Sequence, residues 1–406
     1  MRGSLLLAGL AACTAVGFAL RVNRQRRRAP ALPRAAPRGS AATSVPPRPR
    51  VAVLLPVRDE EDNLLPCLDT LLDQTIRPDV LVVDDGSTDA TRRLAEERVR
   101  AERGPAEHAG DVSAETSPEG TGPGRLEVIG APPPPAGWGG KVHALETGYR
   151  HLAERPSGAP EWILSTDADT RHHPELLART LAAAEAFGLD AVSVAGYQEV
   201  AELGENLLTP PVFALLDALL PDWAAAARGD GPAVANGQFI LLRERALAAI
   251  GGFAAVAGAP IDDVALVTRL REAGHRTGFW RAPDLLRVRM YRGFAGTFEG
   301  WRRNLGGIFG PQPAPTRRIL AALLAGPAVL LALLLTGRRR AAALLWAGGA
   351  TASALLRHAA GHRPGWALLH PLDALVLAAT LSAGVGDWRR GKLARWRGRE
   401  VRASAG

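Results

Sequence analysis

The feature that most constrains the fold of this 406-residue chain is an alternation of short apolar segments with segments of helical periodicity. Four apolar segments have the composition of buried parallel strands: VAVLLP from Val51, DVLVVDDGS from Asp79, RLEVIG from Arg125 and EWILSTDAD from Glu161. The stretches that follow the first three place apolar residues at helical spacing. This alternation predicts an α/β fold with a doubly wound, parallel sheet.

Three of the predicted strands lead into clusters of polar residues: PVRDEEDN after the first, VDDGSTD after the second and TDADT after the fourth. The carboxyl ends of parallel strands lie along one edge of a sheet, and open α/β sheets bind their ligands at this edge. We therefore expect the three clusters to meet. Their coincidence indicates a binding site more strongly than any one cluster does.

The distribution of charge argues against a nucleic-acid-binding surface. The formal net charge is +8, but residues 21–50 hold nine arginines and no acid, and residues 387–402 hold seven basic residues against two acids. The region between these basic arms is therefore acidic overall. Because the arms flank apolar segments, anionic lipid is the expected partner, with no nucleic acid. Cys13 and Cys67 provide neither a disulfide framework nor zinc-site spacing.

Apolar segments at both ends predict a membrane protein. Residues 1–20 are interpreted as an N-terminal transmembrane anchor, because no small-residue cleavage site of a signal peptide precedes the basic block. Residues 21–50 are expected to be a basic linker rich in Pro and Arg, residues 313–390 transmembrane or membrane-associated helices, and residues 391–406 a basic cytoplasmic tail. The predicted location is the cell (plasma) membrane, with several spans and the central domain in the cytoplasm.

The C-terminal region contains three apolar stretches, at residues 319–335, 341–356 and 366–386. Three full spans after a cytoplasmic domain would place the basic tail outside, against the charge rule. One of the three is therefore a candidate for a re-entrant or interfacial segment.

The segment VVDDGSTD has two interpretations. As a structural element, Asp85 and the glycine after it turn the chain, and Ser87 or Thr88 caps the next helix. As a functional element, Asp84 or Asp85 accepts hydrogen bonds from a nucleotide base or ribose, and the glycine permits close approach.

The segment STDADT places Asp167 and Asp169 one residue apart at a strand end. One carboxylate can ligate Mg²⁺ or Mn²⁺, which use few protein carboxylates plus substrate phosphates, while the other steers a ribose or orients the first. A capped turn is one alternative. Another is a phosphatase of the haloacid-dehalogenase type, but that needs a later lysine, and only Lys392 follows. The adjacent His172 and His173 do not easily share a metal, and both are interpreted as helix-entry residues.

Six blocks of sequence, in order, resemble the family 2 glycosyltransferases, which have the GT-A fold. The blocks are VAVLLPVRDEEDNL, VLVVDDGSTDAT, GWGGKVHAL, WILSTDADT, NGQFILLRERALAAIGGF and IDDVALVTRLREAG. The resemblance implies a GT-A domain, Rossmann-like and doubly wound, over residues 51–312. The stretches MYRGFAGTFEGWRRN and RWRGREV most resemble membrane-bound enzymes of the carotenoid and hopanoid-associated type, which glycosylate lipids.

This resemblance implies roles for individual residues. The donor nucleotide would be bound by Pro56, Asp59, Glu60, Asp84, Asp85, Lys141 and Asp167. A divalent ion, Mg²⁺ or Mn²⁺, would be held by Asp167 and Asp169. The catalytic base would be Asp263, with Asp262 as its neighbour; capping of the helix that begins at this pair is compatible with that role. The sugar and acceptor side would comprise Gly237, Gln238, Phe239, Trp301 and Arg302.

The implied reaction suits these residue types. Transfer with inversion requires a carboxylate to take the proton of the acceptor hydroxyl, and cationic charge to stabilise the departing diphosphate. The stretches EGWRRN and LARW lack the glutamine of the Q-x-x-R-W block found in polymerising members, so a non-processive transfer is expected. The resemblance implies a nucleotide diphosphate sugar, with a UDP-sugar expected, and an isoprenoid, carotenoid or hopanoid acceptor. A polyprenyl-phosphate glycosyltransferase and a catalytically silent nucleotide-binding membrane scaffold are the alternatives.

Overall fold

The computed structural model describes residues 2–33, 49–103, 124–219 and 222–391, and the backbone of two short strands, β11 (Ala394–Trp396) and β12 (Arg399–Val401). The chain divides into two compact units. One comprises residues 1–30, 197–224 and 289–394, and the other residues 31–196, 225–288 and 395–406. Much of the expected linker and of the polar insertion expected between residues 101 and 124 lies outside the described residues, as does much of the basic tail.

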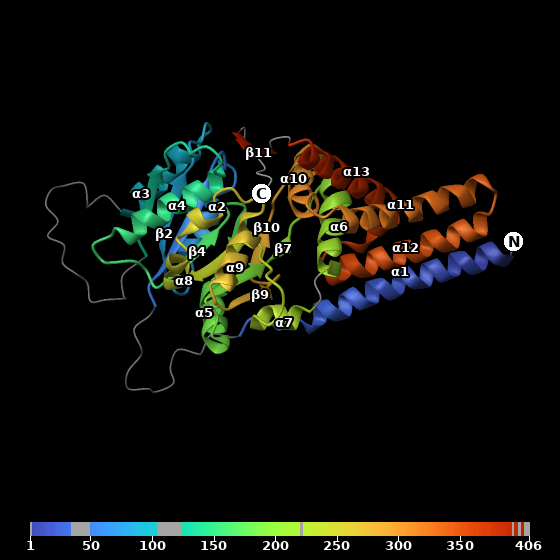
Figure 1. The fold of residues 1–406 in the computed structure, drawn as a ribbon, viewed down its shortest axis with the longest axis horizontal. Coiled ribbons are helices and arrows are strands. Elements are labelled where there is room, and N and C mark those ends of the chain that lie inside the picture. The colour runs from blue at the N-terminus through green and yellow to red at the C-terminus, as the bar shows by residue number, and fades with distance from the viewer. Residues whose placement is uncertain are drawn as a thin grey trace. The chain divides into compact units, whose positions relative to one another are not determined.

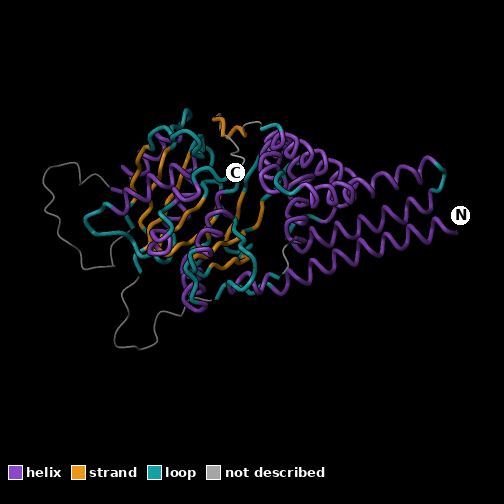
Figure 2. Tube along the Cα trace, viewed as in Figure 1, coloured by secondary structure: helices purple, strands orange, loops and turns teal. Residues whose placement is uncertain are grey.

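The second unit is built around a seven-stranded sheet (Figures 1 and 2). Its strands are β1 (Val51–Val57), β2 (Asp79–Asp84), β3 (Leu126–Gly130), β4 (Trp162–Thr166), β6 (Ala191–Ala195), β8 (Phe239–Arg243) and β9 (Thr277–Arg281), in the order β3-β2-β1-β4-β8-β6-β9. β1 pairs in parallel with β2 and with β4, and β2 pairs in parallel with β3. The four strands predicted from the sequence therefore form, side by side and in one direction.

The sheet is mixed, which corrects the expectation of a wholly parallel one. β8 runs antiparallel to β4 and to β6, and Thr166 at the end of β4 lies opposite Phe239 at the start of β8. An apolar strand pattern carries no information about direction, because direction depends on the path of the preceding connection. The consequence is that β8 begins at the edge where β1, β2 and β4 end. A short antiparallel pair, β5 (Thr170–His172) and β10 (Leu286–Val288), accompanies the large sheet.

Helices alternate with the strands of this unit. They are α2 (Leu64–Leu72), α3 (Thr91–Arg103), α4 (Gly140–Ala153), α5 (Leu176–Phe187), α8 (Glu244–Ala249), the 3₁₀ helix η2 (Phe253–Val256) and α9 (Asp262–Glu272). Apolar side chains of α4, α8, η2 and α9 pack on one face of the sheet, against strand residues such as Leu54 and Ile240. α4 approaches the sheet closely at Gly148, where a Cβ would lie 2.8 Å from side-chain atoms of Leu54 and Val83. A side chain larger than that of glycine at position 148 would push α4 away from the sheet.

The first unit is helical apart from the two-residue strand β7 (Tyr197–Gln198). Its helices are α1 (Arg2–Arg28), α6 (Leu203–Leu219), α10 (Gly293–Phe309), α11 (Pro313–Leu335), α12 (Arg339–Ala359), the 3₁₀ helix η3 (Pro364–Leu369) and α13 (His370–Arg389), while α7 (Trp223–Arg228) spans the boundary between the units. α6, α10 and α13 share an apolar core that includes Leu208, Trp301 and Leu381.

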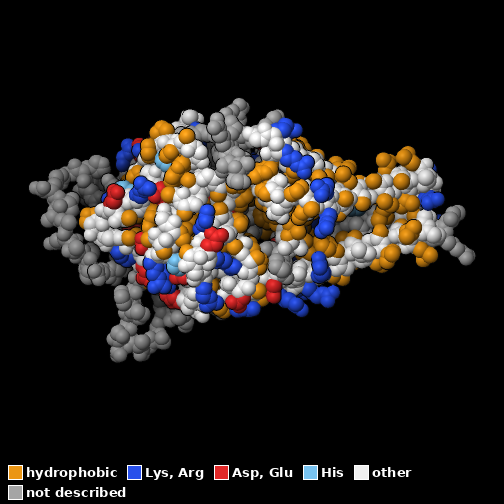
Figure 3. Space-filling view, viewed as in Figure 1, with side chains coloured by type: hydrophobic (Ala, Val, Ile, Leu, Met, Phe, Trp, Pro, Cys, Tyr) orange, Lys and Arg blue, Asp and Glu red, His pale blue; other side chains and the backbone are white. Residues whose placement is uncertain are grey.

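Three helical stretches of the described chain, residues 3–28, 313–335 and 364–389, are long and apolar enough to cross a membrane. Figure 3 shows apolar side chains gathered over α1, α11 and α12, and several leucines of α1 and α11, as well as Leu344 of α12, are exposed. α12, the middle of the three expected C-terminal segments, carries arginines near both ends and is outside this set. The helix α1 continues to Arg28, past the expected end of the anchor at residue 20, because Asn23 and Arg26 make buried contacts within this unit.

Candidate functional site

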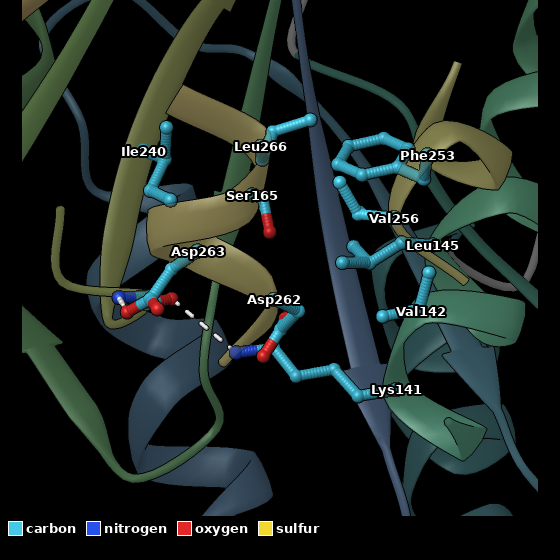
Figure 4. A pocket seen from close by; sticks show the side chains of 11 residues that line it. Lys141, Val142, Leu145, Ser165, Ile240, Phe253, Val256, Asp262, Asp263 and Leu266 are labelled. Atoms are coloured by element: carbon cyan, nitrogen blue, oxygen red, sulfur yellow. Dashed lines mark hydrogen bonds between the residues drawn. The ribbon is translucent and has the colours of Figure 1, made fainter. Parts of the chain in front are cut away.

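The site is built where the carboxyl ends of β1, β2 and β4 meet the start of β8. Two helices begin beside this edge, α4 and α9, and a small pocket lies between them (Figure 4). Lys141 from α4 and Asp262 and Asp263 from α9 provide its charged side chains. Its apolar walls and remaining lining are Val142, Leu145, Ser165, Gly237, Ile240, Phe253, Val256 and Leu266. The pocket therefore joins residues from the end of β4, the start of β8 and the first turns of two helices.

Lys141 lies among three carboxylates. Its Nζ is 2.6 Å from Oδ1 of Asp167 and donates a hydrogen bond of 3.5 Å to the carbonyl of Gly237. Burial lowers the pKa of Lys141, but the charges of Asp167, Asp262 and Asp263 outweigh it and raise that pKa above its ordinary value. The ammonium group is thus charged and partly neutralises the acidic cluster.

Asp263 is held by two backbone donors. The N–H of Gly237 donates to Oδ2 at 2.6 Å, and the N–H of Val264 donates to Oδ1 at 2.8 Å. Burial and the charge of Asp262 raise the pKa of Asp263 to about 6, against the lowering effects of Lys141 and the two backbone N–H groups. A carboxyl group with this pKa is mostly ionised at pH 7 and basic enough to take a proton.

Asp167 and Asp169 lie on the turn between β4 and β5, and both are half-buried. The hydroxyl of Thr170 donates to the carbonyl of Asp167 at 2.6 Å, which closes the turn. Burial raises the pKa of Asp167 above its ordinary range, although the ammonium of Lys141 acts in the opposite direction. This hydrogen bond therefore stabilises the turn that carries the two carboxylates.

The oxygen donors of this turn are of the kind that Mg²⁺ and Mn²⁺ prefer. Over the part of the chain that the structure describes, no three His, Cys, Asp or Glu side chains are arranged to hold a metal by themselves. Mg²⁺ in phosphate chemistry commonly uses one or two protein carboxylates and completes its shell with substrate oxygens and water. Asp167 and Asp169 fit an ion that is bound together with a diphosphate.

Asp84 and Asp85 have different partners at the end of β2. Asp84 accepts hydrogen bonds from the N–H and the hydroxyl of Ser87, at 3.1 and 2.5 Å. Asp85 is buried, with Oδ2 3.7 Å from Nη1 of Arg58, which also donates to the Asp85 carbonyl at 2.6 Å. Asp89, rather than a hydroxyl residue before it, accepts the first backbone N–H of α3 at 2.9 Å. The chain therefore turns here and a side chain caps α3, as the structural interpretation predicts, but the capping residue is Asp89 instead of Ser87 or Thr88.

Asp59 and Glu60 connect the loop after β1 with the loop after β2. Asp59, with φ of +51°, accepts a hydrogen bond of 2.7 Å from the N–H of Thr88. The N–H of Glu60 donates to the hydroxyl of Thr91 at 2.7 Å. Pro56 lies within β1, buried in the sheet. The structure thus brings the first and second polar clusters together, as the strand pattern predicts.

The segment before β8 contributes Gly237 to the pocket. A Cβ at this position would lie 3.0 Å from Nζ of Lys141, so glycine leaves room for the charged side chains. Gln238 is buried, and its backbone carbonyl faces the end of β4. Phe239 is fully buried in the core. Of these three residues, Gly237 lines the pocket, whereas the other two are buried and are not among its lining residues.

Trp301 and Arg302 belong to α10 in the first unit. The indole N–H of Trp301 is buried and donates to the hydroxyl of Thr209 at 3.2 Å. Nε of Arg302 donates to Asp387 of α13 at 2.6 Å. Both side chains therefore have partners inside the helical unit.

His172 corrects an interpretation of the sequence. Only His173 precedes α5, whereas His172 is the last residue of β5 and is 4% exposed. Its ring lies beneath the Asp167–Asp169 turn, within hydrogen-bonding distance of Thr166 and Thr170. The available sequence signal was one threonine on each side of the paired aspartates, followed by the histidine. Arg58, the partner of Asp85, is a second residue that the sequence did not single out.

Comparison with known proteins gives one family match and several matches of fold. Residues 52–108 match the family described as Glycosyl transferase family 2. No curated protein matches the chain. The mannosyltransferase PcManGT from Pyrobaculum calidifontis, solved with GDP-Man and Mn²⁺, is 20% identical with a TM-score of 0.50, over 95% of this chain and 99% of that chain.

Two further solved structures have lower scores. TarS 1–349 from S. aureus is 13% identical with a TM-score of 0.40, over 85% of this chain and 93% of that chain. Glucosyl-3-phosphoglycerate synthase from Mycobacterium tuberculosis, in complex with phosphoglyceric acid, is 16% identical with a TM-score of 0.35, over 63% and 79% of the two chains. The family match and the fold shared with PcManGT support a glycosyltransferase that has a GT-A-like domain with a mixed central sheet.

Proposed function

We propose that this protein is an inverting, non-processive glycosyltransferase that moves one sugar from a nucleotide diphosphate sugar to a lipid-like acceptor. The observation that carries the proposal is the arrangement of Lys141, Asp167 and Asp263 at the carboxyl edge of the sheet, inside a GT-A-like fold. One positive charge and two carboxylates there supply the two requirements of the reaction, a base and a partner for the diphosphate.

Asp263 is the proposed general base. Its carboxylate takes the proton of the acceptor hydroxyl while the hydroxyl oxygen bonds to the anomeric carbon. The bond from that carbon to the diphosphate oxygen breaks on the opposite face, which inverts the configuration. The backbone N–H groups of Gly237 and Val264 fix the carboxylate, and a pKa of about 6 leaves it ionised and ready to accept a proton near neutral pH.

Lys141 is the proposed partner of the departing diphosphate. In the structure its ammonium contacts Asp167 at 2.6 Å, and a donor diphosphate offers a more highly charged partner within reach of the same flexible side chain. A divalent ion bound by Asp167 and Asp169 would supply further positive charge at the leaving group. The Mn²⁺ and GDP-Man in the solved mannosyltransferase of the same fold support both a divalent ion and a nucleotide sugar.

The first and second polar clusters form the proposed nucleotide side. Asp59, Glu60 and Asp85 lie on two loops that are connected to each other, and Asp84 ends the strand before the second loop. Pro56 is buried in β1, one residue before the end of that strand. Gly237 lines the acceptor side of the pocket in this proposal, and Gln238 and Phe239 follow it as buried residues. Trp301 and Arg302 remain proposed acceptor residues of the helical unit.

The membrane helices support a lipid-like acceptor of the isoprenoid, carotenoid or hopanoid kind. Three helices of suitable length and hydropathy would keep the enzyme at the cell membrane, where such acceptors are found, and the soluble donor indicates a cytoplasmic catalytic domain. A polyprenyl-phosphate acceptor is the second candidate, because it satisfies the same membrane argument.

The test is turnover of nucleotide sugars by the purified full chain in detergent with Mn²⁺. A panel of UDP- and GDP-sugars, read by release of the nucleoside diphosphate, should contain at least one donor that is hydrolysed or transferred. Failure to bind or turn over any of them would contradict the proposed enzyme, and binding without turnover would leave the silent nucleotide-binding scaffold as the better account. Mass spectrometry of membrane lipids with and without the protein then identifies the acceptor by an added sugar mass, and separates a neutral lipid from a polyprenyl phosphate.

A further inference from the structure

A buried polar network lies directly beneath the turn that carries Asp167 and Asp169. It consists of His172 and Thr170 from the two ends of β5, Thr166 from the end of β4 and Thr70 from α2. The side chains of Thr166, Thr170 and His172 are at most 4% exposed. The network thus joins three elements, α2, β4 and β5, at one histidine ring.

The protons of this network can be assigned by counting donors. The hydroxyl of Thr166 donates to the carbonyl of Gln238 at 2.7 Å, and the hydroxyl of Thr170 donates to the carbonyl of Asp167 at 2.6 Å. Each hydroxyl has one proton, so neither can also donate to His172. Nε2 of His172 lies 3.0 and 3.2 Å from these two oxygens and must therefore carry a proton that it donates to them.

The other ring nitrogen has a different partner. Nδ1 of His172 lies 3.2 Å from the hydroxyl of Thr70, and that hydroxyl also accepts the backbone N–H of His172 at 3.1 Å. With Nε2 protonated and the ring neutral, Nδ1 is a hydrogen-bond acceptor beside the Thr70 hydroxyl, whose single proton is shared between this nitrogen and the carbonyl of Cys67 at 2.9 Å. Burial and the charge of Arg171 lower the pKa of His172 to about 3, so the neutral ring is the form present at physiological pH.

We propose that His172, as a neutral imidazole protonated at Nε2, is a positioning residue that sets the donor turn and the pocket segment before β8 relative to each other. It acts on the turn through Thr170, whose hydroxyl fixes the Asp167 carbonyl. It acts on residues 236–238 through Thr166, whose hydroxyl fixes the Gln238 carbonyl. Gly237 in that segment holds Asp263, so one ring supports both the diphosphate side and the base.

This inference rests on the proposed function for its kinetic consequences, and its structural consequence is independent of it. Loss of the Nε2 proton donor leaves two threonine oxygens unsatisfied and frees both segments to shift. Small displacements of a donor-binding group weaken productive binding strongly, so the donor KM should rise by at least about tenfold. The exchange of backbone amides in both segments should accelerate.

Three substitutions of His172 separate the contributions of Nε2, of Nδ1 and of the ring itself. Glutamine places its amide N–H near the position of Nε2, asparagine reaches only to the position of Nδ1, and phenylalanine keeps the ring without either nitrogen. We expect His172→Gln to retain a donor KM near that of the wild type, and His172→Asn and His172→Phe to raise it. His173→Gln is the matched control, because His173 is exposed and its Nδ1 accepts only the nearby N–H of Glu175.

A second control measures general damage to the core. Thr180 in α5 is fully buried, and its hydroxyl donates to the Leu176 carbonyl outside the network. Thr180→Val should lower the melting temperature without changing the donor KM. The proposal is overturned if Thr180→Val raises that KM as much as His172→Phe does, or if glutamine at 172 is as impaired as asparagine.

Hydrogen exchange of the full chain in detergent decides the structural part without a donor. Peptides covering residues 165–170 and 236–240 should exchange faster in His172→Phe than in the wild type, and unchanged in His173→Gln. Unchanged exchange of both peptides in His172→Phe would contradict the proposal. If instead the wild type turns over no nucleotide sugar, the proposed function fails, while the exchange result still decides the role of His172.

Discussion

The carboxylate of Asp263 accepts a hydrogen bond of 2.6 Å from the backbone N–H of Gly237, and this bond connects the first turn of α9 with the segment that enters β8. The same glycine offers its carbonyl to Lys141 at 3.5 Å. The backbone of one residue therefore lies between the proposed base and the proposed partner of the leaving group. This relationship depends on the antiparallel direction of β8, which starts at the edge where the parallel strands end.

Asp263→Asn should retain donor binding and lose transfer. The amide keeps the size of the side chain but cannot take a proton, so the rate of transfer should fall by about 10²- to 10⁴-fold with little change in donor affinity. Initial rates and donor titrations of the two proteins provide the measurement. Glu272→Gln, an exposed position at the last residue of α9, is the matched control. Normal transfer by Asp263→Asn would remove Asp263 from the role of base.

The rate should depend on pH through Asp263. Burial and the neighbouring Asp262 raise the pKa of this carboxyl to about 6 in the free protein, and only the ionised form accepts a proton. As the pH falls through 6 the carboxylate is protonated, so kcat/KM should decrease by about tenfold per pH unit below that value. A profile from pH 4.5 to 8 at saturating metal tests this. A kcat/KM that stays level down to pH 5 would exclude a base with this pKa.

Lys141→Met should weaken donor binding. The ammonium is a charge-assisted hydrogen-bond donor, and its loss should lower donor affinity by about 10- to 100-fold. Because the substitution also leaves three carboxylates without their cation, the melting temperature must be measured beside the donor Kd. Arg150→Met on the exposed side of the same helix is the control for loss of a basic residue from α4. Equal donor affinity in wild type and Lys141→Met would separate this lysine from the diphosphate.

Asp169→Ala should weaken donor binding only in the presence of metal. If Asp167 and Asp169 hold a divalent ion against the diphosphate, removal of one carboxylate lowers the Mn²⁺-dependent part of donor affinity and leaves the metal-free part nearly unchanged. Donor titrations with Mn²⁺ and with a chelator give both parts. The same metal dependence in wild type and variant would place the ion elsewhere.

The sequence predicts the residues at the ends of the parallel strands better than it predicts the residues around β8 and those buried near the pocket, for a physical reason. Asp84, Asp167 and Asp59 follow strands whose apolar pattern is strong, and the carboxyl ends of parallel strands meet at one edge whatever the details of packing. The reversal of β8 depends on a long connection through helices, and no local pattern encodes it. The environments of buried residues such as His172 and Phe239 depend on tertiary contacts. The sequence pattern assigned His172 to a helix entry, and the family resemblance assigned Phe239 to the acceptor side.

The difference between the expected and the observed end of α1 has a similar explanation. Hydropathy predicts apolar stretches, but it does not predict that α1 continues past its apolar part. The continuation to Arg28 is stabilised by tertiary partners: Arg26 pairs with Asp217 of α6 and donates to the Leu356 carbonyl at the end of α12. The basic segment that the sequence assigns to a linker is, in its first part, the end of a packed helix.

The buried pair Arg26–Asp217 gives the last prediction. The two side chains are 3% and 10% exposed, and Nη2 of Arg26 lies 2.5 Å from Oδ2 of Asp217. Removal of one partner leaves an uncompensated buried charge, so Arg26→Met should lower the stability of the helical unit by about 3–5 kcal/mol. Removal of both charges in Arg26→Met/Asp217→Leu should cost much less than the sum of the single substitutions, because apolar side chains of similar volume often replace a buried pair at little cost. Thermal unfolding of the four proteins in one detergent completes the cycle.

Arg27→Met, in the same turn of α1 but exposed, is the control. Additive losses in the double variant would mean that the two charges do not stabilise each other, and that α1 is held to this unit by its apolar face alone.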